Sequence, residues 1–280
     1  MTHANPTPQP HTDASDAPLA LVTGGGAGIG REIALAFAAA GWRVHICGRN
    51  EAPLIDTAAT SPLIDYTRAD ITDAAQVDQL FAAATRRGPL AAVILNAGLP
   101  GQPAEFGDTD LADFRAVIET NVHGTFLCAR QAFAILKTQF HQGLPAGRSL
   151  VNCSIAAARP RPHTAAYATS KSAVAGMAHV MALDGRDHGV LVTRVDIGNA
   201  ETELLRAFTD TKAEETTTTP ASTAATPENP PHPAPQPAPE PSFNARYAAE
   251  AFVSAASLPA SVVVDHLTIT AAGMPFLGRG

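Results

Sequence analysis

Clusters of positive charge are missing from this sequence. It has 280 residues with a formal net charge of -7, and its 19 lysines and arginines form no extended run. Proteins that bind a nucleic-acid backbone or an anionic lipid surface usually present such a run. We therefore expect neither nucleic acid nor membrane among the partners.

Cysteine is scarce as well. The three cysteines, Cys47, Cys128 and Cys153, are far apart, and each lies inside an apolar stretch. None has the spacing of metal ligands, so no metal site is expected. Buried reduced thiols of a cytoplasmic protein are the favoured interpretation.

Long apolar runs are also absent. No segment is long enough to span a bilayer, and residues 1–18 lack the basic start and apolar run of a signal peptide. Residues 1–18 contain Pro, His, Thr and Asp, and we predict that they form a disordered leader.

The rest of the chain alternates short apolar runs with helical segments. The predicted strands are 19–23, 42–47, 63–67, 90–95, 148–153, 190–196 and 261–268. The predicted helices are 31–40, 51–59, 73–87, 110–139, 164–184 and 244–257. This alternation predicts a single α/β domain over residues 19–280, a doubly wound parallel sheet of about seven strands covered on both faces.

One segment interrupts this pattern. Residues 211–242 are rich in threonine, then dominated by proline and alanine. Proline excludes a helix or an inner strand here, so we predict a disordered or polyproline-like insertion in a surface loop. A passive spacer and a module that docks into aromatic-lined grooves both remain open.

Small and polar residues follow most of the predicted strands. Ligands of doubly wound sheets bind at the carboxyl ends of the strands, which is where these residues fall. They are Gly24, Gly28 and Gly30 after the first strand, then Arg49, Asp70, Asn96, Ser154 and Gly198 after the following ones.

The three glycines lie between a strand and a helix. A turn without Cβ atoms lets a phosphate approach the backbone, and the helix N-terminus supplies N–H groups. Their spacing differs from the usual G-x-G-x-x-G of dinucleotide sites, so a merely flexible turn is the alternative.

Tyr167 and Lys171 are four residues apart and share one face of a predicted helix. A free phenol loses its proton only near pH ~10, but an ammonium group beside it favours the phenolate. The pair is therefore a candidate proton donor and acceptor, although the same spacing also occurs by chance on exposed helices.

Together these motifs resemble the short-chain dehydrogenase/reductase family, from Leu19 to about Thr270. The resemblance rests on the Thr-Gly-x-x-x-Gly-x-Gly spacing, the Asn-Ala-Gly triplet and the interval of thirteen residues between Ser154 and Tyr167. Asn121, in the stretch Asn-Val-His-Gly-Thr-Phe, resembles the family's catalytic asparagine, and Asp70 its aspartate at the adenine end. The family's fold is a Rossmann-type sheet, in agreement with the prediction above.

The resemblance implies a role for each catalytic residue. Tyr167 would be the general acid in ketone reduction and the base in alcohol oxidation, with Lys171 stabilising its phenolate and holding the nicotinamide ribose. Ser154 would bind the substrate oxygen, and Asn121 would hold a water that relays protons. The implied cofactor-binding residues are Thr23, Gly24, Gly28, Ile29, Gly30, Arg49, Asp70, Ile71, Asn96, Ala97, Gly98, Tyr167, Lys171, Gly198, Ala200 and Thr202.

The end of the second strand predicts which cofactor is bound. Sites specific for NAD place a carboxylate here against the ribose 2′-hydroxyl. This chain has Gly48 followed by Arg49, a suitable partner for a 2′-phosphate, so we expect NADP(H) rather than NAD(H). A simply solvated Arg49 is the alternative.

Two regions depart from the family. Ile197 replaces the proline that usually precedes Gly198, and Ala200 stands where valine or isoleucine is usual. The insertion falls where the family has its substrate-binding lid, so the substrate is the least predictable feature. Between Ser154 and Tyr167 the chain carries Arg159, Arg161 and His163, which indicate either an anionic substrate or a solvated basic loop.

The sequence therefore predicts an NADP(H)-dependent oxidoreductase that acts on a carbonyl or secondary alcohol. The alternative is a catalytically silent dinucleotide-binding sensor or scaffold. By resemblance, the chain would form a homodimer or homotetramer through the helices that begin near Asp110 and Thr164.

Overall fold

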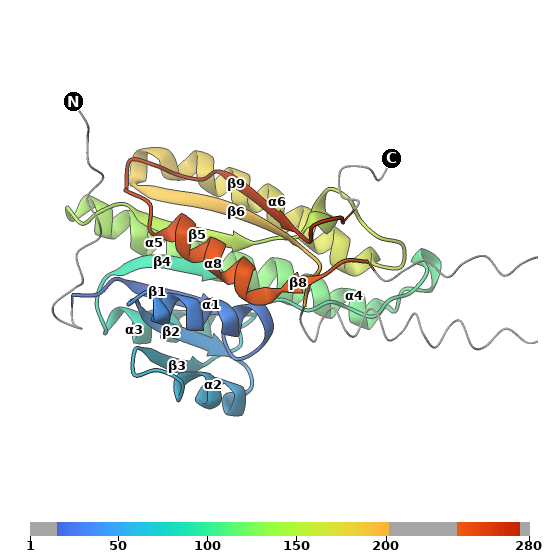
Figure 1. The fold of residues 1–280 in the computed structure, drawn as a ribbon, viewed down its shortest axis with the longest axis horizontal. Coiled ribbons are helices and arrows are strands. Elements are labelled where there is room, and N and C mark those ends of the chain that lie inside the picture. The colour runs from blue at the N-terminus through green and yellow to red at the C-terminus, as the bar shows by residue number, and fades with distance from the viewer. Residues whose placement is uncertain (1–15, 202–239, 275–280) are drawn as a thin grey trace, which may run out of the picture.

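The structure, a computed structural model, describes residues 16–201 and 240–274. Its centre is a parallel sheet of seven strands in the order β3-β2-β1-β4-β5-β6-β9 (Figure 1). The strands are β1 Leu19–Thr23, β2 Arg43–Gly48, β3 Ile64–Arg68, β4 Leu90–Leu95, β5 Gly147–Asn152, β6 Val190–Gly198 and β9 His266–Thr270. The predicted doubly wound sheet is confirmed.

Helices cover both faces of the sheet. Helices α1 and α8 pack against one face, with α2 beside them, and α3, α5 and α6 pack against the other (Figure 1). The helices are α1 Gly28–Ala39, α2 Glu51–Ala58, α3 Ala74–Thr85, α4 Leu111–Ile118, α5 Thr125–His141, α6 Ala165–Gly185 and α8 Ala245–Ala256. Short 3-10 turns occupy Phe106–Asp108, Ile155–Ala157 and Arg186–His188.

Strand β1 shows why the inner strands are apolar throughout. Leu19 and Leu21 belong to the core under α3, α5 and α6, whereas Ala20 and Val22 belong to the core under α1 and α8. Successive side chains of a strand point to opposite faces, so a strand buried on both faces needs apolar residues at every position. The edge strand β3 reads IDYTR and is partly exposed, because one side of it is open.

Two predictions about elements were wrong in detail, and one pair of strands was missed. The helix expected over 110–139 is divided into α4 and α5 by a π-helical turn, Glu119–Gly124. The last strand begins at His266 instead of Ser261. Two short paired strands, β7 Ala200–Glu201 and β8 Phe243–Asn244, were not predicted at all.

A buried arginine holds the connection that precedes β9. Arg148 of β5 is buried, and its Nη2 donates to the carbonyl oxygens of Leu258, Pro259 and Val262 at 2.7, 2.8 and 2.9 Å. These bonds hold the irregular connection between α8 and β9 against β5.

The predicted leader and insertion lie mostly outside the described residues, which omit 1–15, 202–239 and 275–280. Of the leader, Ala17 is buried and its carbonyl oxygen accepts from Arg43 Nε at 2.9 Å. Of the insertion, Ser242 donates to Glu201 Oε1 at 2.8 Å. The chain that follows the insertion thus returns to the end of β7.

The three cysteines are buried and unpaired, as predicted. Burial raises the pKa of Cys47 to about 12 and also raises the pKa of Cys128 and Cys153, because a thiolate is poorly solvated in the core. Within the described ranges no group of three or more potential metal ligands occurs. No helix in those ranges is long and apolar enough to cross a membrane.

Candidate active site

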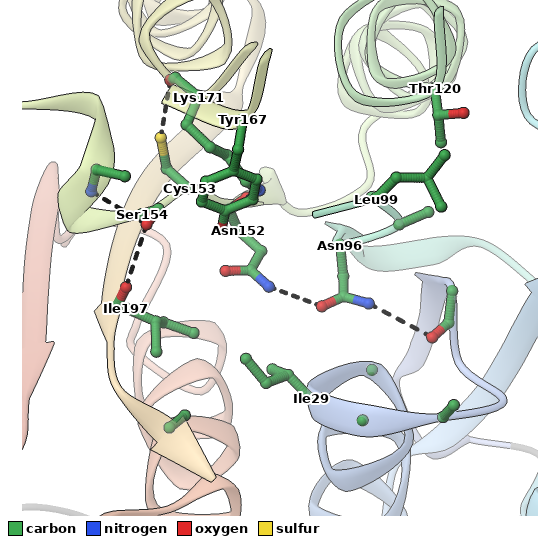
Figure 2. Close-up of a pocket in the computed structure, with 18 of the residues that line it drawn as sticks. Ile29, Asn96, Leu99, Thr120, Asn152, Cys153, Ser154, Tyr167, Lys171 and Ile197 are labelled. Carbon is green, nitrogen blue, oxygen red and sulfur yellow. Dashed lines mark hydrogen bonds between the residues drawn. The ribbon is translucent and has the colours of Figure 1, made fainter. Parts of the chain in front are cut away.

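A cavity of about 440 Å³ opens at the carboxyl ends of the strands. Fifteen of the predicted site residues line it: Gly24, Gly28, Ile29, Gly30, Arg49, Asp70, Ile71, Asn96, Ala97, Gly98, Ser154, Tyr167, Lys171, Gly198 and Ala200. Thr23 and Asn121 lie behind its wall, and Thr202 lies outside the described residues. Segments far apart in the sequence therefore meet at one site (Figure 2).

The turn after β1 leaves room for a ligand. Gly28 has a φ of +52°, and a Cβ built on it would meet no atom within 4 Å. A Cβ on Gly30 would instead lie 2.1 Å from the carbonyl oxygen of Gly24, so α1 can begin this close to β1 only with glycine there. No side chain caps the N-terminus of α1, which leaves its N–H groups available for an anion.

A hydrogen-bond network joins the ends of β1, β4 and β5. Thr23 Oγ1 accepts from the backbone N–H groups of Asn96 and Ala97 at 2.9 and 3.1 Å. Asn96 Nδ2 donates to the carbonyl oxygen of Thr23 at 2.9 Å, and Asn152 Nδ2 donates to Asn96 Oδ1 at 2.7 Å (Figure 2). The network holds the floor of the cavity rigid, so Thr23 supports the site without lining it.

Sequence reasoning missed Asn152, which lines the cavity. Besides its bond to Asn96, its carbonyl oxygen accepts from Lys171 Nζ at 2.9 Å. Its Oδ1 is buried and has no hydrogen-bond partner among the described residues. The available signal was a polar side chain at the end of a buried strand, two residues before Ser154.

Tyr167 and Lys171 stand on consecutive turns of α6. Lys171 is buried, and its Nζ lies 5.7 Å from the centroid of the Tyr167 ring (Figure 2). Within the described ranges no carboxylate forms an ion pair with Lys171, and its ammonium is held by the carbonyl of Asn152. A buried positive charge thus lies beside the phenol, as the spacing of four residues predicts.

Ser154 faces the same space from the end of β5. Its Oγ accepts from the N–H of Ala156 at 3.1 Å and makes only a long contact, 3.5 Å, with the carbonyl oxygen of Ile197. A hydroxyl proton rotates to suit its partner. The Ser154 hydroxyl can therefore turn toward a ligand oxygen in the cavity.

Asn121 occupies the π-helical turn between α4 and α5. Its Oδ1 accepts from the N–H of Leu99 at 2.7 Å, and its Nδ2 donates to Leu99 O and Ser170 Oγ, both at 2.9 Å. These three bonds use both donors of the amide. The side chain braces the loop after β4 against α6, and the structure does not bring it into the cavity. Such π turns are frequent at functional sites.

The other end of the cavity is lined by Arg49 and Asp70. Arg49 follows the last residue of β2, Gly48, and its side chain is exposed. Asp70 Oδ1 accepts from the N–H and the hydroxyl of Thr72 at 3.0 and 2.8 Å. The carboxylate is thereby fixed at the cavity edge, whereas the guanidinium of Arg49 has no hydrogen-bond or ion-pair partner among the described residues.

The residues after β6 form a cross-linked turn. Asn199 has a φ of +54°, a left-handed conformation that asparagine tolerates better than most residues. Its Nδ2 donates to Glu240 Oε2 at 3.0 Å and to the carbonyl oxygen of Pro241 at 3.1 Å. Arg161 donates to both Asn199 Oδ1 and Glu240 Oε2. This network was not predicted, because its members come from three distant segments.

Comparison with known proteins agrees with these features. A model of the short chain dehydrogenase family matches residues 18–213. A short-chain dehydrogenase/reductase of Armillaria gallica is 33% identical over 70% of this chain and 76% of its own length. Sulfoacetaldehyde reductase 2 of Chromohalobacter salexigens is 34% identical over 66% of this chain and 74% of its own length. Glucose 1-dehydrogenase of Gluconobacter oxydans is 31% identical over 72% of this chain and 77% of its own length.

Solved structures show the same fold. The 3-ketoacyl-(acyl-carrier-protein) reductase of Brucella melitensis, complexed with NADH, has a TM-score of 0.77 at 23% identity, covering 92% of this chain and 98% of its own. An actinorhodin polyketide ketoreductase with NADPH also has a TM-score of 0.77, at 24% identity. The match covers 95% of this chain and 99% of the ketoreductase. With its seven-stranded sheet, its glycine turn and the matching family model, this chain belongs to the short-chain dehydrogenase/reductase family of oxidoreductases.

Proposed function

We propose that this protein is an NADP(H)-dependent oxidoreductase that interconverts a carbonyl compound and a secondary alcohol. The observation that carries the proposal is the convergence of Ser154, Tyr167 and Lys171 on the cavity that also contains the glycine turn. The relatives named above include a dehydrogenase and a reductase, which supports this class of reaction.

The cavity fits a dinucleotide. The open face of Gly28 and the uncapped N–H groups of α1 suit a pyrophosphate, and the cavity volume falls within the range of about 300–1,000 Å³ typical of cofactor sites. Lys171 and Asn152 lie farther along the cavity, where they would hold the nicotinamide ribose. When bound, the nicotinamide supplies or accepts the hydride.

The side chains of α6 and β5 carry the proton chemistry in this proposal. In the reductive direction Tyr167 donates its hydroxyl proton to the substrate oxygen, and in oxidation it removes that proton. The ammonium of Lys171 stabilises the negative charge left on the tyrosine oxygen. Ser154 donates a hydrogen bond to the substrate oxygen as charge develops there.

Asn121 has a different part in the proposal from the one that the family resemblance implies. Both donors of its amide are bound to Leu99 and Ser170, and its side chain does not line the cavity where a relay water would meet the substrate site. We assign it a positioning role, in which it fixes the α6 turn that carries Tyr167 and Lys171 against the loop after β4.

Arg49 is proposed to select NADP(H) through the 2′-phosphate. Replacing it by alanine is expected to weaken NADPH binding by about 10- to 100-fold, the cost of losing a hydrogen-bonded charge pair, while changing NADH binding by less than about twofold. Fluorescence titration of both cofactors with wild type and Arg49→Ala measures this difference.

The matched control is Arg246→Ala, which removes the same charge from the exposed surface of α8, where Arg246 pairs with Glu250. It should leave both affinities unchanged. A wild-type preference for NADH, or an equal loss of affinity for the two cofactors in Arg49→Ala, would show that Arg49 does not bind the 2′-phosphate.

We further propose a homo-oligomer that packs through α5 and α6. Phe126, Val180 and Leu183 on these helices are 50%, 58% and 56% exposed, although each is a large apolar side chain. Light scattering is expected to give the mass of a dimer or tetramer, and Val180→Glu with Leu183→Glu is expected to shift it to a smaller species. Ile55→Glu, on the exposed side of α2, is the control that should not change the mass. A monomeric wild type would contradict the proposal.

A further inference from the structure

The loop between β5 and α6 carries three basic side chains beside the proposed chemistry. Arg159 and Arg161 line the same cavity as Ser154 and Tyr167, whereas His163 is exposed and does not line it. Because this loop joins the two catalytic positions, its arginines lie at the substrate end of the cavity and not at the glycine turn. The structure assigns the two arginines different surroundings.

The charge of Arg161 is balanced. It forms an ion pair with Glu240 and also donates to Asn199 Oδ1, while Asn199 Nδ2 donates to the same carboxylate at 3.0 Å. These bonds tie the substrate-side loop to the turn after β6 and to the chain that returns after the insertion. Arg161 is therefore held as part of the cavity wall, and its guanidinium is already bound to Glu240 and Asn199.

Arg159 has no such partner among the described residues. Its backbone N–H donates to the carbonyl oxygen of Ile155 at 2.8 Å, which fixes its Cα one turn after Ile155, the residue that follows Ser154. Among those residues its guanidinium contacts only the carbonyl oxygen of Ala158, at 3.3 Å, and the side chain is exposed at the cavity rim. A planar charged group on a long chain is thus available at the entrance.

The distribution of charge in the cavity favours a negative ligand at this end. Asp70 is the single carboxylate among the described lining residues, and it lies at the end of β3, beside the proposed adenine site. Near Ser154 the lining contains Arg159, the buried ammonium of Lys171, and Arg161, whose charge is neutralised by Glu240. The protein as a whole has a charge of -7, so this local excess of positive charge opposes the overall balance.

We propose that the substrate is a carbonyl compound, or the matching alcohol, that carries an anionic group remote from the reacting carbon, and that Arg159 binds this group. A carboxylate, sulfonate or phosphate group presents the paired oxygens that a guanidinium contacts with two parallel hydrogen bonds. The inference rests on the proposed function, because it places the reacting oxygen at Ser154 and Tyr167 and the anion at the cavity rim.

The test compares oxo acids with their neutral methyl esters. A series of ω-oxo and keto acids of increasing chain length is assayed with NADPH against the corresponding methyl esters. For the best-fitting length, wild type is expected to prefer the acid in kcat/KM by about twofold to fivefold, as for an exposed ion pair. The preference is expected to lie in KM and to shrink as salt is added.

Substitution assigns the preference to one side chain. Arg159→Gln is expected to raise KM for the acid to about that of the ester, with a much smaller change for the ester, and Arg159→Lys to retain part of the preference. Arg246→Gln on α8 is the charge-matched control. Independently of turnover, short alkyl sulfonates should quench the fluorescence of the NADPH complex more weakly in Arg159→Gln than in wild type.

Two results would overturn the inference alone: ester turnover without any preference for the acid in wild type, or an equal loss for acid and ester in Arg159→Gln. No turnover of any acid or ester would overturn the proposed function, and this inference with it. The neutral esters thus separate a failure of anion recognition from a failure of the catalytic assignment.

Discussion

Replacing Tyr167 by phenylalanine is expected to lower kcat for carbonyl reduction by about 10²- to 10⁴-fold, the usual contribution of a positioned general acid. The substitution removes one oxygen and leaves the ring that Lys171 approaches to 5.7 Å. NADPH affinity is therefore expected to stay within about twofold of wild type. Steady-state kinetics and fluorescence titration with the same preparation measure the two effects.

The chain supplies a matched control, since its other tyrosines are Tyr66 and Tyr247. Tyr247 is 55% exposed on α8 and does not line the cavity, so Tyr247→Phe removes the same oxygen from outside the site and should leave kcat unchanged. Turnover that survives Tyr167→Phe would remove the tyrosine from the mechanism. A wild type that binds NADPH tightly but reduces no carbonyl compound would instead favour the silent-binder alternative.

Acid is expected to destabilise the fold through His45. This residue of β2 is buried, its Nε2 contacts Thr67 Oγ1 at 2.9 Å, and its Nδ1 has no hydrogen-bond partner within the described ranges. Burial lowers the pKa of His45 from 6.5 to about 4, with smaller effects from Asp65, which raises it, and Arg87, which lowers it.

The direction of the pH dependence follows from this lowered pKa. The unfolded chain takes up the proton at a higher pH than the folded chain, so the stabilisation is complete above pH 6.5 and is lost as the pH falls through about 4. The loss attributable to His45 is about 3 kcal/mol in the free energy of unfolding. Urea unfolding at a series of pH values between about 7 and 4 measures it.

The variant His45→Gln removes the titrating group and keeps a polar side chain next to Thr67. Its free energy of unfolding should fall less steeply with acid than that of wild type, whatever its value at neutral pH. His179→Gln, at an exposed position of α6, should keep the wild-type slope. Identical slopes for wild type and His45→Gln would show that His45 does not limit acid stability.

Local spacing made much of the fold and site predictable. The order of strands and helices, the glycine turn before α1 and the meeting of Tyr167 with Lys171 follow from residues close together in the sequence. A helix places residues four apart on one face, and parallel strands bring their carboxyl ends to one edge, whatever the remaining sequence is. These features need no knowledge of distant partners.

Other features depend on contacts across the fold. The connection before β9 is held by Arg148, whose guanidinium reaches carbonyls more than a hundred residues away. Asn121 lies behind the cavity wall because Leu99 and Ser170 bind its amide. Nothing in the local sequence distinguishes such a bracing amide from one that faces a ligand.

The basic loop shows the same division. The sequence by itself determined that Arg159 and Arg161 stand between Ser154 and Tyr167, and therefore near the substrate, because strand and helix fix both ends of that loop. Only the tertiary structure decided which arginine has a carboxylate partner. Glu240 follows Arg161 by 79 positions in the sequence, and the two meet because the chain returns to the end of β7. Charge pairing depends on distance in space, which the spacing of residues along the chain does not determine once a long segment intervenes.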